Sequence, residues 1–79
     1  MSADLRMTLI GEVTDTYRQT VEISVQWDEG ADPAEEAEAE IVIGGDGDIV
    51  LDQEGAEQFA RLFVSACWEA ARIRPGGAA

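Results

Sequence analysis

Carboxylates are the main residues of this sequence that could do chemistry. The 79 residues include seventeen of them, together with five arginines, one cysteine and no histidine or lysine. The lack of histidine and lysine removes imidazole catalysis, most zinc sites and the phosphate-binding P-loop. A glycosidase-type carboxylate pair needs one carboxyl group in an apolar pocket that raises its pKa. Nearly all the acids here fall in expected loops or on solvent-facing strand positions, so we expect neither enzymatic activity nor a cofactor.

Two further features bear on metal or nucleophilic chemistry. Residues 44–48 (GGDGD) resemble the glycine–aspartate calcium repeats of parallel β-rolls, but the aspartate stands one position early and there is a single copy. The run also lacks the carboxylate spacing of an EF-hand loop, so we expect a turn and no metal site. Cys67 is predicted to be a small buried apolar side chain, since no histidine is present to hold a thiolate.

The charge is distributed unevenly along the chain. Residues 20–59 contain thirteen carboxylates and no arginine, whereas the two ends carry four acids and all five arginines. The middle therefore sums to −13 and the ends to +1, which gives the formal total of −12. This field repels nucleic-acid phosphate and anionic lipid, so we expect no direct nucleic-acid or membrane binding and favour a basic protein partner. The alternative is that the acidity only keeps a small protein soluble.

A partner-binding surface is predicted from the middle acids, with an apolar patch near Trp27 or Trp68 for retention. The predicted acids are Asp28, Glu29, Asp32, Glu35, Glu36, Glu38, Glu40, Asp46 and Asp48. Trp68 lies about half a turn from the centre of the apolar helix stripe, which leaves two interpretations. Either the acidic loop or the C-terminal tail covers it, with Arg72 stacked on its face, or it forms an exposed ridge with Val64 and Ala71 that seals against a second copy or a target.

The elements that must position these residues begin with two strands, near 5–13 and 20–27. Alternation predicts that one face of the first strand is buried and that the other is solvent-facing. The predicted buried set is Leu5, Met7, Leu9 and Val13 in the first strand, and Val21, Ile23, Val25 and Trp27 in the second. The predicted solvent face carries Arg6, Thr8, Glu12, Glu22, Ser24, Gln26 and Glu40. Turn residues 15–18 join the two strands as an antiparallel hairpin.

An acidic loop over 28–40, a third extended segment over 40–51 and a helix over 53–74 complete the chain. The third segment is either one bulged strand or a tight hairpin with its turn at 44–48, and the Asp46-Gly47 pair favours the hairpin. Asp52 is the expected helix N-cap, and residues 75–79 form a flexible tail. The helix residues predicted to face the sheet are Phe59, Leu62, Phe63, Ala66, Ala70 and Ile73.

The pattern predicts a single α+β domain in which a three- or four-stranded antiparallel sheet packs on one C-terminal helix. The extended segment IVLDQEGAEQFARLF leading into an Ala-rich helix resembles small acidic proteins of actinobacteria and their phages. In physical type the chain is also similar to phage-encoded inhibitors such as anti-CRISPR proteins and other nucleic-acid mimics. The resemblance implies an inhibitor that docks on a basic nucleic-acid-binding partner, and the alternative is a homodimeric structural module. With no long apolar stretch and no secretory signal, a cytoplasmic location is expected.

Overall fold

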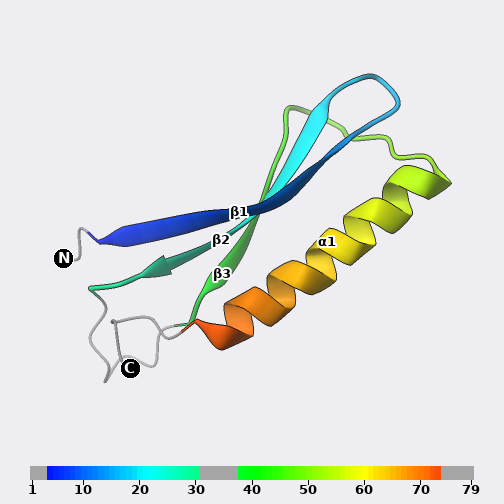
Figure 1. Cartoon of the computed structure of the whole chain (residues 1–79). Coiled ribbons are helices and arrows are strands. Elements are labelled where there is room, and N and C mark those ends of the chain that lie inside the picture. Colours follow the sequence, from blue (N-terminus) through cyan, green and yellow to red (C-terminus); the bar gives the residue numbers. More distant parts are fainter. Residues whose placement is uncertain (1–3, 31–37, 74–79) are drawn as a thin grey trace.

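Three antiparallel strands and one helix make up the fold (Figure 1). The structure is a computed structural model that describes residues 4–30 and 38–73. Strand β1 spans Leu5–Thr14, β2 spans Thr20–Asp28, β3 spans Glu40–Gly44, and helix α1 spans Gln53–Arg72. Strand β2 is central and pairs with β1 on one side and with β3 on the other. The helix packs on one face of this sheet, so the predicted α+β fold with a C-terminal helix is confirmed.

The core lies between β2 and the sheet-facing side of α1. Ile23, Val25 and Ala66 are fully buried and form its centre. The alternation of β2 places its apolar residues on the helix side, and the small Ala66 lets the helix approach the strands closely. Five of the six helix residues predicted to face the sheet belong to this core, namely Phe59, Leu62, Ala66, Ala70 and Ile73. Phe63 is 38% exposed and stacks on Phe59 at a ring-centroid distance of 6.3 Å, so it lies at the margin.

A β-bulge in β1 changes which side of that strand faces the helix. Leu9 pairs with Ser24 and Gly11 pairs with Ile23, so Ile10 is an extra residue without a partner in the ladder. Because side chains alternate with a period of two, one inserted residue moves every side chain before it to the opposite face.

The prediction that the first half of β1 is buried is therefore wrong. Leu5, Met7 and Leu9 lie on the open face of the sheet and are 63%, 57% and 56% exposed, whereas Val13, beyond the bulge, is buried as predicted. Arg6 and Thr8, predicted on the solvent face, pair with Trp27 and Val25 and so share the side that carries the helix.

The other positions predicted on the solvent face do lie on the open face. Glu12 pairs with Glu22, and Gln26 pairs with Glu40. Glu22 and Gln26 alternate along β2 with residues that are buried on the helix side, so both pairs point away from the helix. Ser24 also lies on this face, but it is 8% exposed.

The third extended segment is shorter than predicted. Strand β3 ends at Gly44, and the described residues 45–52 contain no further strand, so the favoured hairpin does not form. Residues 49–51 instead run past the β1–β2 turn, where the backbone N–H of Thr16 donates to the carbonyl oxygen of Val50 at 3.0 Å. The sheet accordingly has three strands in the described part of the chain.

Helix α1 begins where the sequence predicts and ends two residues earlier. An Asp52 carboxylate oxygen accepts a hydrogen bond from the Gly55 N–H at 2.7 Å, which is the expected N-cap. Ile73 has extended backbone angles and ends the helix. Arg74 and the predicted tail 75–79 lie outside the described residues. Within the described ranges, no helix has the length and apolarity needed to span a bilayer.

Candidate functional site

Strand β3 forms one edge of the sheet and is short, β-branched and uncharged along its centre. It consists of Ile41, Val42 and Ile43 between Glu40 and Gly44, a composition that favours a strand. Within the described residues it pairs only with β2, so its outer row of backbone N–H and C=O groups is open. An open edge of this kind is a template for pairing with another extended chain.

Carboxylates stand at both ends of this edge. Glu38 and Glu40 precede the centre of β3, and Asp46 and Asp48 follow it, all four exposed. Glu40 accepts a hydrogen bond from Gln26 Nε2 at 3.1 Å. Among the described residues, no arginine lies within ion-pair distance of any of the four. The edge therefore combines open backbone groups with an uncompensated negative charge, and this surface is called the acidic edge below.

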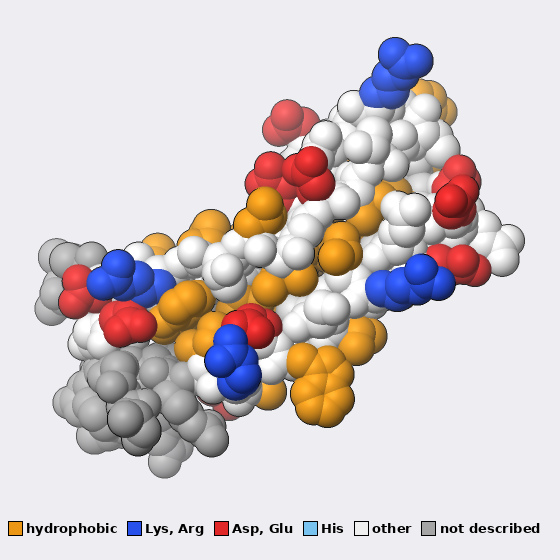
Figure 2. Space-filling model, viewed as in Figure 1, with side chains coloured by type: hydrophobic (Ala, Val, Ile, Leu, Met, Phe, Trp, Pro, Cys, Tyr) orange, Lys and Arg blue, Asp and Glu red, His pale blue; other side chains and the backbone are white. Residues whose placement is uncertain are grey.

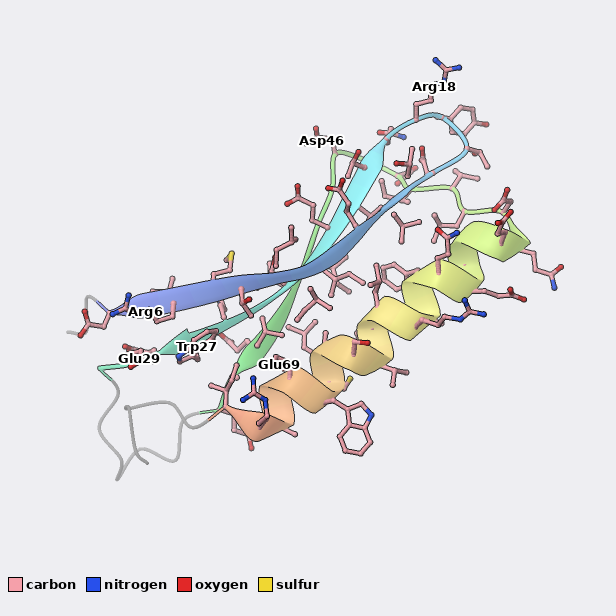
Figure 3. The ribbon with its side chains drawn as sticks, viewed as in Figure 1. Arg6, Arg18, Trp27, Glu29, Asp46 and Glu69 are labelled. Atoms are coloured by element: carbon pink, nitrogen blue, oxygen red, sulfur yellow. The ribbon has the colours of Figure 1, made fainter. Side chains whose placement is uncertain are left out.

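A polar hollow of about 530 Å³ lies next to this edge, at the end of the molecule that also carries Arg18 (Figure 3). Its lining residues are Arg18, Gln19, Thr20, Glu22, Gly44, Gly45 and Asp46. No cluster of three or more potential metal ligands occurs in the described residues. The mixture of one arginine and two acids makes this hollow a place for polar contacts at the border of the acidic edge.

Asp28 and Glu29 follow Gln26, which pairs with Glu40, so they lie beside the Glu38 and Glu40 end of the acidic edge. They lie at the opposite end of the molecule from Asp46, where β2 ends (Figure 3). Asp28 accepts a hydrogen bond from the Gly30 N–H, and Glu29 accepts one from Trp27 Nε1 at 3.0 Å, so both stabilise the local chain. The described acids among those predicted are thus divided between two ends of the sheet, with Asp28, Glu29, Glu38 and Glu40 at one end and Asp46 and Asp48 at the other. Asp32, Glu35 and Glu36 lie outside the described residues.

Asp15 is a structural residue whose importance sequence reasoning missed. It is 6% exposed, and its carboxylate accepts hydrogen bonds from the backbone N–H groups of Tyr17, Gln19 and Val50. Burial by itself raises the pKa of Asp15, but the hydrogen bonds from Gln19, Val50 and Tyr17 outweigh burial, and the net effect is a lowered pKa. Asp15 thereby fixes the 45–52 segment against the β1–β2 turn. The only sequence signal was an aspartate in a turn.

The outer side of α1 carries an exposed apolar ridge. Trp68 is 75% exposed and Val64 is 54% exposed, which corresponds to the interpretation of an uncovered ridge. Arg72 forms an ion pair with Glu69 on the same helix. A shallow hollow of about 310 Å³ is lined by Phe63, Val64, Cys67, Trp68 and Ala71.

Cys67 is exposed, so the prediction of a buried thiol is wrong. The reason is that the apolar arc of the helix extends further around its axis than the sheet can cover.

This apolar arc begins on the side of the helix that faces β3. Leu62 packs on Gly11 of β1, and Ala66 faces the centre of the sheet. Because successive residues turn by about 100° around a helix, Phe63 and Cys67 lie on the other side of Ala66, towards β3. Ile43 shares the helix side of the sheet through its pairing with Ile23. It is nevertheless 51% exposed, so α1 leaves the inner side of β3 incompletely covered.

The space-filling view shows how these groups are distributed on one side of the molecule (Figure 2). Hydrophobic side chains reach the surface over both the sheet and the helix, and most of the visible acidic side chains lie towards the two ends. Some acidic side chains on this side also lie directly beside hydrophobic ones, so apolar and acidic surfaces adjoin.

Comparison of the chain with protein-family models, curated proteins and solved structures finds no match. The fold and the surface thus define a small acidic α+β domain with one acid-bracketed open sheet edge and one exposed aromatic ridge.

Proposed function

We propose that this protein is a non-enzymatic binding module that docks the acidic edge of its sheet on a basic protein partner. The observation that carries the proposal is the uncharged centre of strand β3, residues 41–43, which among the described residues pairs only with β2. Glu38 and Glu40 stand at one end of it, and Asp46 and Asp48 at the other. An extended basic segment complements both properties of this edge. Its backbone continues the sheet, and its cationic side chains approach the carboxylates at the two ends.

The partner class follows from the same complementarity. Proteins that bind nucleic acid present basic surfaces to phosphate, and binding to those surfaces is largely electrostatic. A body of formal charge −12 competes for such a surface. We therefore assign the protein the role of an inhibitor of the nucleic-acid-mimic type, the physical type to which phage-encoded anti-CRISPR proteins belong.

In this proposal, Trp68 slows the dissociation of the bound partner. Long-range attraction speeds encounter, whereas apolar contacts that exclude water slow dissociation. The ridge around Trp68 adjoins the flank of α1 that faces β3. If a strand of the partner pairs with β3, the helix or loop that follows this strand in the partner can cover Ile43 and Phe63 and contact the ridge. Exposed tryptophan is a frequent anchor in interfaces.

The alternative function is a homodimer that forms through Val64, Trp68 and Ala71. It is favoured by the exposure of Val64 and Trp68. A buried aromatic side chain contributes about 150–250 Å², however, and a standard interface needs roughly 800 Å² per partner. The ridge alone is therefore small for a stable dimer and better suited to anchoring part of a larger contact.

The proposal is tested first with a synthetic peptide of alternating arginine and valine, titrated calorimetrically over a salt series. We expect binding that weakens as salt increases, and no binding of the same peptide with glutamate in place of arginine. The variant Glu38→Gln/Asp46→Asn should bind several-fold more weakly than Glu12→Gln/Glu57→Gln, which has the same net charge but alters exposed acids elsewhere. Equal affinities for the two variants, or an affinity independent of salt, would contradict the proposal.

The inhibitor role is tested by competition. A purified basic DNA-binding domain is loaded with a fluorescent duplex, and the protein is added until the anisotropy stops changing. Displacement of the duplex by the wild-type protein, and weaker displacement by Glu38→Gln/Asp46→Asn, is the expected result. Peptide binding without displacement would retain the binding module but reject the mimic role.

A further inference from the structure

The second open edge of the sheet has a different character from the acidic edge. Strand β1 pairs only with β2 within the described residues, so its outer side is open along its length. On the open face of the sheet it displays Leu5, Met7 and Leu9 at alternate positions, each more than half exposed. Their neighbours on β2 are Asp28, Gln26 and Ser24, which are polar. Within the described structure, this apolar row lies along the outermost strand of the sheet.

The charge of the chain indicates what can approach this row. Two copies of a body with formal charge −12 repel each other, and the repulsion is smallest where facing surfaces lack carboxylates. Residues 5–11 contain Arg6 and no acid, whereas β3 has four carboxylates at its ends. In a self-paired β3, these carboxylates would face one another. Strand β1 is consequently the edge at which a second copy meets the least repulsion.

The order of the side chains in β1 is self-complementary. In an antiparallel pairing of two β1 strands about a two-fold axis at Met7, Leu5 of one copy lies opposite Leu9 of the other, and Met7 lies opposite its own counterpart. The apolar row of each copy then contacts the row of the other. The bulge at Ile10 ends the regular stretch on both sides of the axis.

We propose that the β1 edge binds the β1 edge of a second copy, joining two three-stranded sheets into one continuous sheet. Both helices then lie on the same side of the joined sheet, and the two β3 strands form its outer edges. The dimer therefore presents two acidic edges, and the Trp68 ridge takes no part in its formation. This inference goes beyond the proposed partner binding and does not depend on it.

Cross-linking at the two-fold axis tests the pairing geometry. Directly opposed residues of antiparallel strands have Cα atoms about 4.5–5.5 Å apart, which is within the range of a disulfide. Met7→Cys/Cys67→Ala should form a disulfide-linked dimer under mild oxidation, the second change removing the exposed native thiol. Arg6→Cys/Cys67→Ala is the matched control, because residue 6 would face residue 8 of the other copy. Cross-linking of neither variant, or equal rates for both, would overturn the proposal.

Sedimentation of the protein without cross-links provides the second measurement. In high salt, which screens the repulsion, the wild-type protein should sediment with the mass of a dimer at high concentration. Met7→Lys places two cations at the axis and should give a monomer with an unchanged circular dichroism spectrum, whereas Trp68→Ala should remain dimeric. A monomeric wild type in high salt, or a dimer that Trp68→Ala abolishes and Met7→Lys retains, would reject the β1 pairing.

Discussion

Leu62 of α1 lies directly against Gly11 of β1: a Cβ atom built on residue 11 would stand 2.7 Å from Leu62 Cδ2. This close approach occurs one residue after the bulge at Ile10, where β1 turns its other side to the helix. The glycine thus provides space for the Leu62 side chain. Helix and sheet are fitted to each other at this point.

The substitution Gly11→Ala should therefore lower the free energy of unfolding by about 1–3 kcal/mol, the usual range for overpacking. Urea denaturation followed by circular dichroism measures the change. A double-mutant cycle with Leu62→Ala provides the control, since the cost of the added methyl group should shrink when Leu62 is removed. An equal cost in both backgrounds would show that the contact with Leu62 is not the cause.

Asp15→Asn should destabilise the protein more than Asp46→Asn. The first change replaces a carboxylate that accepts hydrogen bonds from three backbone N–H groups of two segments with an amide, whose oxygen is a weaker acceptor. The second change removes an exposed acid from a highly negative protein. Thermal unfolding at neutral pH measures the difference. A larger loss for Asp46→Asn would contradict the role assigned to Asp15.

The lowered pKa of Asp15 also predicts a pH dependence. A carboxyl whose pKa is lower in the folded than in the unfolded state contributes stability above the unfolded value of about 3.9, and loses it as the pH falls through the folded value. The stability difference between the wild-type protein and Asp15→Asn should therefore be constant near neutral pH and shrink below about pH 4. Denaturant titrations of both proteins across that interval measure it. A constant difference down to strong acid would contradict the prediction.

Gly47 adopts a left-handed backbone conformation with φ 68°, and a Cβ atom there would contact nothing within 4 Å. Gly47→Ala should thus cost about 1–2 kcal/mol from backbone strain alone. Gly44→Ala is the matched control, because Gly44 is equally open and its φ is not positive. The two variants are compared by urea denaturation, and an equal effect would show that backbone conformation is not the determinant.

Trp68→Ala should leave the free energy of unfolding within about 0.5 kcal/mol of the wild-type value, because the indole is 75% exposed. Ile23→Val removes one methyl group from a fully buried side chain and should cost more, about 0.5–1.5 kcal/mol. Chemical denaturation ranks the two. A marked destabilisation by Trp68→Ala would mean that the ridge is part of the folded core.

Several features of this protein follow from local sequence alone. The Asp52 cap, the alternation of β2 and the period of the helix stripe each depend on residues a few positions apart, so pattern and propensity predict them. The uneven charge is likewise a property of the sequence, and the proposal of a basic partner rests on it. The position of β3 also follows from local sequence but its predicted length is too great, since residues 49–51, two of them β-branched, carry the signal of a strand whether or not a partner strand is present.

Only the tertiary structure decided the features that depend on distant contacts. The open-face position of Leu5, Met7 and Leu9 depends on the single bulged Ile10, which alternation cannot reveal because the residues on either side look alike. The course of residues 45–52 depends on a hydrogen bond between Val50 and Asp15, thirty-five residues apart in the chain. Likewise, the antiparallel pairing of β2 with β3 places Glu38 and Glu40 beside the end of β2 that carries Asp28, and Asp46 and Asp48 at the other end. Sequence sets the period and charge of each segment, whereas the packing of segments against one another sets which side of each faces solvent.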